Sequence, residues 1–103
     1  MTKDELKLYQ TSISTDDKGK VSVTYYKTAI VTFDDETIVL NSGGWWTRTT
    51  LVRMNQVSRH FNLGYRVFIK DTQWYVEFKE EKCPFDIKQI RLDRKTESIT
   101  LHT

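Results

Sequence analysis

The sequence is poor in the residues that form disulfides and metal sites. Its 103 residues include one cysteine, Cys83, and two histidines, His60 and His102. A lone cysteine excludes an intrachain disulfide. A structural zinc site takes about four cysteine or histidine ligands at close spacing, whereas these three residues lie far apart in the chain. We therefore expect no disulfide, no metal and no cofactor.

The sequence also lacks long apolar runs and familiar catalytic motifs. No segment approaches the roughly 20 consecutive apolar residues of a membrane-spanning helix, and the N-terminal MTKDELKLYQ has no apolar core of a secretory signal. Phosphate-binding loops, dinucleotide fingerprints and the nucleophile elbow of serine hydrolases are missing as well. We expect a protein that does not associate with a membrane.

What is present is sufficient for a folded core. Hydrophobic residues make up 38% of the chain and aromatic residues 13%, which is more than disordered chains contain. A chain of 103 residues has the size of one ordinary domain. We expect residues 1–103 to form a single domain.

The abundance of threonine, valine, isoleucine, tyrosine and phenylalanine predicts a fold rich in strands. We expect strands near residues 6–14, 21–33, 37–40, 65–70, 74–78 and 98–102, with a bulge or bend at Tyr26. Residues 79–82 look like a solvated charge run, and residues 85–92 form either a strand or a helical turn. Since no helix follows each strand, a parallel sheet is not expected.

One segment shows helical periodicity. Its apolar stripe consists of Leu51, Met54, Val57, Ser58 and Phe61. Thr49 or Thr50 is a suitable N-cap, and Gly64 is the natural residue to end the helix. The sequence therefore predicts an α+β fold, mainly antiparallel β-sheet with a single α-helix, about residues 50–62, packed on it.

Charge is unevenly distributed along the chain. The net charge of +2 divides into −2 for residues 1–36, +5 for residues 37–70 and −1 for residues 71–103. The central block has no aspartate or glutamate, and four of its five cations are arginine. The arginine side chain binds phosphate with a planar fork and stacks on rings.

This central block is the candidate binding segment. We expect its cations to contact phosphates and Trp45 or Trp46 to stack on bases, as in proteins that bind single-stranded DNA or RNA. The cations are Arg48, Arg53, Arg59, Arg66 and Lys70. In the alternative interpretation the arginines lie on different faces and pair with acids, while one tryptophan is in the core and the other covers it.

The segment from Asn41 to Val76 resembles a set of short bacteriophage proteins of unassigned function. They share a pattern N-S-G-G-W/Y-x-T-x-T-T, followed by R-M-N-Q and by G-Y-x-V and W-Y-V, and the matching stretch here begins NSGGWWTRTTLVRMNQ. The resemblance implies a phage origin and action in the cytoplasm of the infected host cell. It also directs attention to Ser42, Arg53, Asn55 and Gln56, polar residues near the Gly-Gly turn that could contact a ligand. In the alternative, Ser42 stabilises the turn and Asn55 or Gln56 ties the helix to the loop.

Four functions follow from these observations. The first is a non-catalytic phage accessory protein that binds single-stranded DNA or RNA. The second is an inhibitor or modulator of a host enzyme or anti-phage defence system, because tryptophan and arginine also anchor protein interfaces. A structural protein of the virion and a metal-dependent enzyme are less favoured. The carboxylates such an enzyme would need include Asp34, Asp35 and Glu36, which are more simply a hairpin turn.

Overall fold

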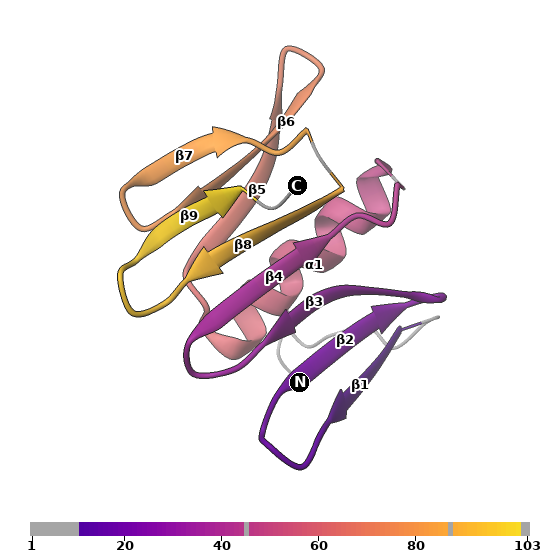
Figure 1. Cartoon of the computed structure of the whole chain (residues 1–103). Helices are drawn as coiled ribbons and strands as arrows, with labels where there is room; N and C mark the ends of the chain where they lie inside the picture. The colour runs from indigo at the N-terminus through magenta and orange to yellow at the C-terminus, as the bar shows by residue number, and fades with distance from the viewer. Residues whose placement is uncertain (1–10, 45, 87, 102–103) are drawn as a thin grey trace.

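The computed structural model describes residues 11–44, 46–86 and 88–101, within which the chain forms nine strands and one helix. In chain order these are β1 (Thr11–Thr15), β2 (Val21–Tyr25), β3 (Thr28–Phe33), β4 (Thr37–Asn41), α1 (Arg48–Phe61), β5 (Tyr65–Lys70), β6 (Gln73–Phe78), β7 (Glu81–Pro84), β8 (Gln89–Asp93) and β9 (Ser98–Leu101) (Figure 1). Every strand pairing is antiparallel. The predicted α+β fold is confirmed.

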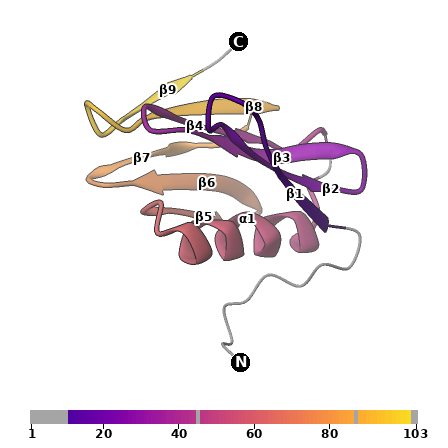
Figure 2. The same ribbon diagram turned by 90° about the horizontal axis from the view of Figure 1, so that it is seen from below.

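The strands divide between two sheets that face each other. One sheet has the order β1-β2-β3-β4-β8-β9, and the other has the order β5-β6-β7. In Figure 2 the three-stranded sheet lies beneath the larger one, and α1 continues its layer beside β5. The helix contacts β2 and β3, and β7 contacts β9, so the second layer spans most of the first.

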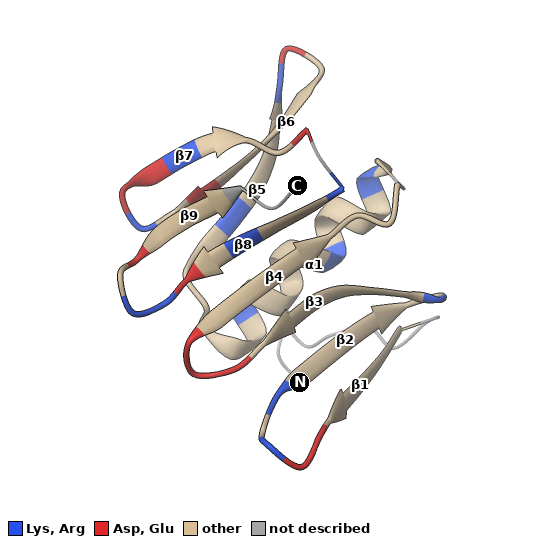
Figure 3. Ribbon diagram, in the orientation of Figure 1, with Lys and Arg blue, Asp and Glu red and all other residues tan. Residues whose placement is uncertain are grey.

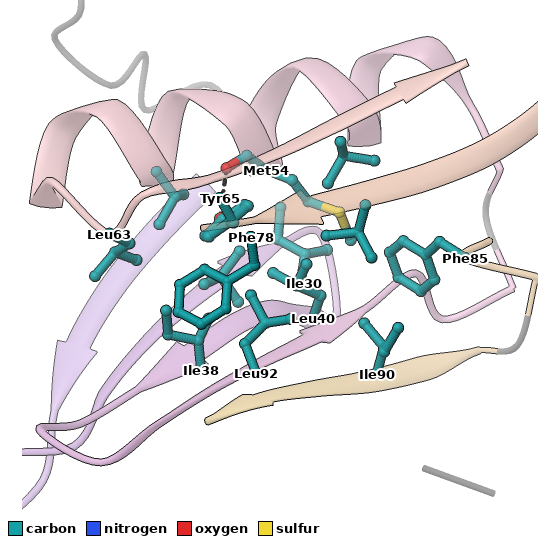
Figure 4. Packing of buried hydrophobic residues seen from close by; sticks show 14 of the residues in the cluster. Ile30, Ile38, Leu40, Met54, Leu63, Tyr65, Phe78, Phe85, Ile90 and Leu92 are labelled. Carbon is teal, nitrogen blue, oxygen red and sulfur yellow. Dashed lines mark hydrogen bonds between the residues drawn. The ribbon is translucent and has the colours of Figure 1, made fainter. Parts of the chain in front are cut away.

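The core fills the space between these layers (Figure 4). Alternating residues of the strands point into it, as the period of two along a strand requires. The fully buried residues of largest volume are Phe78, Phe85, Ile30, Ile38, Leu40, Met54, Ile90 and Leu92. Tyr65 donates its hydroxyl proton to the carbonyl oxygen of Met54 at 2.6 Å, and burial raises the pKa of this phenol.

Two side chains of α1 attach the helix to the edge of β5. The amide of Asn55 accepts a hydrogen bond from the backbone N–H of Val67 and donates one to its carbonyl, both at 2.8 Å. One turn later the Ser58 hydroxyl donates to the carbonyl of Tyr65 at 2.7 Å and accepts from its N–H at 3.2 Å. These backbone groups point away from β6, so α1 takes the place that a fourth strand would occupy.

Both ends of α1 differ from the expected ones. The N-cap is Thr47 rather than Thr49 or Thr50, and its hydroxyl accepts from the backbone N–H of Thr50. At the other end Asn62, not Gly64, takes the left-handed conformation that stops the helix. Asparagine tolerates that conformation better than most residues because its short side chain bonds locally.

Two further expectations about the strands are corrected. The run from residue 21 to 33 is two strands rather than one bent strand, because Tyr26 and Lys27 form a two-residue turn. A register shift does occur, between Val23 and Thr24. The expected charge run at 79–82 is a turn followed by β7, whose last residue is Pro84.

The loop between β4 and α1 depends on a glycine. Gly43 has a φ of 65°, and a Cβ atom there would lie 2.8 Å from both Oγ1 and Cγ2 of Thr28. The side chain of Asn41 accepts a hydrogen bond from the backbone N–H of Gly43, and the side chain of Ser42 accepts one from the backbone N–H of Gly44. The loop is therefore held tightly against the start of β3.

The turn between β5 and β6 carries avoidable strain. Asp71 and Thr72 both have positive φ, at 55° and 65°, as a type I′ turn requires. A β-branched residue is disfavoured there. We expect Thr72→Gly to stabilise the protein by about 1 kcal/mol, or roughly 4–8 °C in Tm. The matched control is Thr96→Gly, at a turn position without positive φ, and an equal gain there would contradict this explanation.

Candidate functional site

The structure distributes the predicted binding residues over three places. Arg48, Arg53, Asn55, Gln56 and Arg59 are on α1, Arg66 and Lys70 are on β5, and Trp46 lies in the loop before α1. Trp45 lies outside the described residues. The central block is therefore continuous in sequence but not one surface.

The cations of α1 lie apart from one another (Figure 3). Arg48 and Arg59 are both exposed, but eleven residues of helix separate them by about 16 Å. Arg53 is half-buried, donates from Nη1 to Oε1 of Gln56 at 3.0 Å, and places its guanidinium 5.6 Å from the ring centre of Tyr25. Arg53 and Gln56 are thus engaged with each other, as Asn55 is with β5.

Trp46 covers part of the core. Its ring meets those of Trp74 and Phe85 edge to face, at centre distances of 4.9 and 5.4 Å. Trp74 and Phe85 are buried, whereas 40% of Trp46 is exposed. Trp46 therefore lies as a lid over Trp74 and Phe85. The expectation for the tryptophan pair also concerns Trp45, which lies outside the described residues.

The outer face of β5-β6-β7 collects aromatic and basic residues that come from separate parts of the sequence. The register places Arg66, Glu77 and Lys82 in one row across the three strands. The next row consists of Phe68, Tyr75 and Pro84, and Lys70 lies opposite Gln73 in the third. The pairs that alternate with these rows, Tyr65–Phe78 and Val67–Val76, are buried on the other face. We call this outer face the aromatic platform.

The side chains of the aromatic platform contact one another closely. The rings of Phe68 and Tyr75 stack with centres 5.6 Å apart and an angle of 16° between their planes. The guanidinium of Arg66 lies 4.5 Å from the ring centre of Phe68, and the ammonium of Lys82 lies 6.0 Å from it. The platform thus combines two nearly parallel rings with two cations near the ring of Phe68.

One carboxylate opposes the cations of the platform. Oε1 of Glu77 lies 3.1 Å from Nη2 of Arg66, and both side chains are largely exposed. Such an exposed pair contributes only about 0–1 kcal/mol to stability. The three cations Arg66, Lys70 and Lys82 therefore outnumber the single acid, and the pair is weak enough to open.

The sequence analysis did not single out Tyr75 and Lys82, which the structure places on the aromatic platform. The alternation of residues 65–70 and 74–78 already placed Arg66, Phe68 and Tyr75 on alternating positions, and the hairpin that joins the two strands brings those positions to one face. Lys82 was not recognisable in this way, because its segment was expected to be a solvated charge run.

The ionisable groups outside the platform have local structural roles. Asp34 accepts from the backbone N–H groups of Glu36 and Thr37, which lowers the pKa of its carboxyl. Burial raises the pKa of the Cys83 thiol, and the nearby charges of Glu81 and Asp86 raise it further. Among residues 11–44, 46–86 and 88–101, no three histidine, cysteine or acidic side chains gather where a metal ion could bind. Within the same ranges no helix is long and apolar enough to cross a membrane.

Comparison with known proteins identifies a family. A family described as Kyanoviridae Gp96 protein matches residues 1–93, far beyond the segment from 41 to 76 that carries the resemblance in sequence. Neither a curated protein nor a solved structure matches the chain.

Proposed function

The chain belongs to the Kyanoviridae Gp96 protein family, a family of phage proteins, and on that premise we propose that it is a non-catalytic accessory protein that binds single-stranded nucleic acid. The binding surface is the aromatic platform on β5-β6-β7. The protein acts in the cytoplasm of the infected host, where single-stranded phage DNA and RNA are available. The observation that carries the proposal is the stacked pair of Phe68 and Tyr75 beneath Arg66 and Lys82.

The chemistry of the platform suits a flexible strand better than a duplex. Every base has a flat face, and stacking on an aromatic side chain contributes about 1–3 kcal/mol per base without sequence preference. A sheet surface that presents rings is how several RNA-binding modules hold unpaired bases. Arg66 and Lys82 lie in the row before these rings, and Lys70 lies in the row after them. From these positions the three cations can contact the phosphates on either side of the stacked bases.

The proposal is tested by binding labelled 12-nucleotide single strands of DNA and RNA over a range of salt concentrations. Release of counterions by three cations predicts a slope of about −2 in log K against log salt, at roughly −0.7 per contact for single strands. Lys70→Gln and Lys82→Gln should each reduce the slope by about 0.7. Lys95→Gln is the matched control, since Lys95 lies in the β8–β9 turn and pairs with Glu36. Absence of binding to both strands at low salt would refute the proposal.

The carboxylate of Glu77 should act against binding. Glu77→Gln removes the partner of Arg66 and one negative charge from the platform, so we expect affinity for a single strand to rise roughly three- to tenfold. Glu36→Gln is the control, because Glu36 forms an exposed pair of the same 3.1 Å length with Lys95 in another part of the fold. If both variants raise affinity equally, the effect is one of net charge and not of the platform.

A second function, inhibition or modulation of a host protein, is favoured by one observation. Ile69 is 42% exposed and lies directly opposite Trp74 in the β5-β6 pairing, and the exposed ring of Trp46 rests on Trp74. Exposed tryptophan beside an aliphatic residue is typical of an interface anchor. A host protein that is retained in stoichiometric amount after nuclease treatment, and lost with Trp46→Ser, would support this alternative.

A further inference from the structure

A pocket of about 590 Å³ lies between the β2–β3 turn and the segment that leads into α1. This volume is within the usual range for small-molecule sites, about 300–1,000 Å³. Its lining residues are Tyr25, Tyr26, Lys27, Thr28, Ile30, Ser42, Thr47, Thr49 and Thr50. The pocket is on the opposite flank of α1 from the aromatic platform, because Arg53 contacts Tyr25 on one flank and Asn55 contacts β5 on the other.

The walls of this pocket have a distinctive chemistry. Tyr25 and Tyr26 supply flat aromatic surface and Ile30 supplies aliphatic surface. Thr28 and Thr49 supply hydroxyl groups, which can donate and accept hydrogen bonds, whereas the hydroxyls of Ser42, Thr47 and Thr50 are engaged in local hydrogen bonds. Among the described residues, the lining includes one cation, Lys27, and no carboxylate. A matching ligand has a flat ring, hydrogen-bonding groups on the ring edge, and no positive charge.

Tyr26 lies at the mouth of the pocket in an unfavourable conformation. Its φ is 58°, and 60% of the residue is exposed. Its ring meets that of Tyr25 at 4.7 Å and 65°, so that the two rings form a corner. Asparagine, aspartate or glycine is the usual choice for positive φ in a two-residue turn. A bulky aromatic residue held there indicates that the ring serves binding rather than stability.

We propose that this pocket binds a single nucleotide, with the base in the corner of Tyr25 and Tyr26 and the phosphate near Lys27. The nucleotide is either a free nucleoside monophosphate or one unit of a single strand, since both present the same base and phosphate. The pocket shares no residue with the aromatic platform. The inference therefore goes beyond the proposed function and does not depend on it.

The direct test is an NMR titration of the labelled protein with AMP, CMP, GMP and UMP, with the corresponding nucleosides, and with the 12-nucleotide strands. We expect shifts of backbone amides within 25–30 and 42–50, and binding of nucleotides roughly three- to tenfold tighter than nucleosides. If the strand shifts these amides at lower concentration than the monophosphates do, the source is the strand; the reverse order identifies a free nucleotide. No shift there with any of these ligands at millimolar concentration would overturn the proposal.

Two variants separate binding from folding. Tyr26→Asn should raise Tm, because it relieves the positive φ, and should weaken nucleotide binding at least fivefold. Lys27→Gln should abolish the difference between nucleotide and nucleoside, whereas Lys95→Gln should retain it. Unchanged affinity in Tyr26→Asn would overturn the site.

Strand-induced shifts at residues 66–82 report the aromatic platform, so failure of the pocket and failure of the proposed function are distinguished in one spectrum.

Discussion

Replacing Asn55 with alanine should lower the free energy of unfolding by about 2–3 kcal/mol. The side-chain amide makes two hydrogen bonds of 2.8 Å to the backbone of Val67. Its removal leaves an N–H and a carbonyl of β5 without partners beneath the helix, and such groups cost about 1–3 kcal/mol each when buried. The better helix propensity of alanine offsets only about 0.5 kcal/mol of this loss.

The measurement is urea unfolding followed by circular dichroism, with the midpoint and the m-value compared between variants. Gln56→Ala is the matched control, because Gln56 is the next residue of α1 and its side chain accepts a hydrogen bond from the side chain of Arg53 rather than from β5. We expect a loss of less than about 1 kcal/mol there. Equal losses in the two variants would show that the attachment of α1 to β5 does not depend on the amide of Asn55.

Replacing both rings of the aromatic platform, in the double variant Phe68→Leu with Tyr75→Leu, should weaken binding of a single strand by a factor of at least about 30. Each lost stacking interaction is worth about 1–3 kcal/mol, and a factor of ten in affinity corresponds to about 1.4 kcal/mol. Leucine retains apolar surface at both positions, so the sheet should remain folded. Fluorescence anisotropy of a labelled strand measures the affinity, and circular dichroism checks the fold.

Trp46→Leu distinguishes the platform from the loop that precedes α1. The ring of Trp46 packs over Trp74. We therefore expect Trp46→Leu to change the affinity for a single strand less than threefold, which corresponds to under about 0.7 kcal/mol. A large loss with Trp46→Leu together with none in the Phe68 and Tyr75 double variant would place base stacking in the loop instead.

Most of the fold could be predicted because the local patterns are strong. The strands at 65–70 and 74–78 and the helix near 50–62 follow clear periodicities, and the structure has them within a few residues. The ends of α1 could not be fixed from sequence, since Thr47, Thr49 and Thr50 are equally suitable as caps. Contacts elsewhere in the chain decide which of them is used.

The turn at Tyr26 and the strand β7 were missed for different physical reasons. Tyr26 and Lys27 lack the glycine or asparagine that signals a two-residue turn, so the segment looks like one strand. The exposed Glu81 and Lys82 resemble a solvated loop, although an edge strand commonly carries such charges.

The net charge of a sequence segment does not show which charged residues share a surface. The five cations of the central block are close in sequence, yet three of them are spread along α1 and the other two are on β5. The surface that combines rings and cations takes Arg66, Phe68 and Lys70 from this block, Tyr75 from the next strand and Lys82 from β7. Register across three strands, which the sequence does not specify directly, determines that combination.

The contact between Gly43 and Thr28 restricts how this protein can change over evolutionary time. A Cβ atom at position 43 would collide with both branches of the Thr28 side chain, so a substitution at 43 becomes tolerable only after position 28 has become smaller. The positive φ of Gly43 further restricts any later substitution at position 43 to residues such as asparagine. Residue 28 therefore has to change before residue 43. The start of β3 and the loop between β4 and α1 are coupled in the substitutions that they accept.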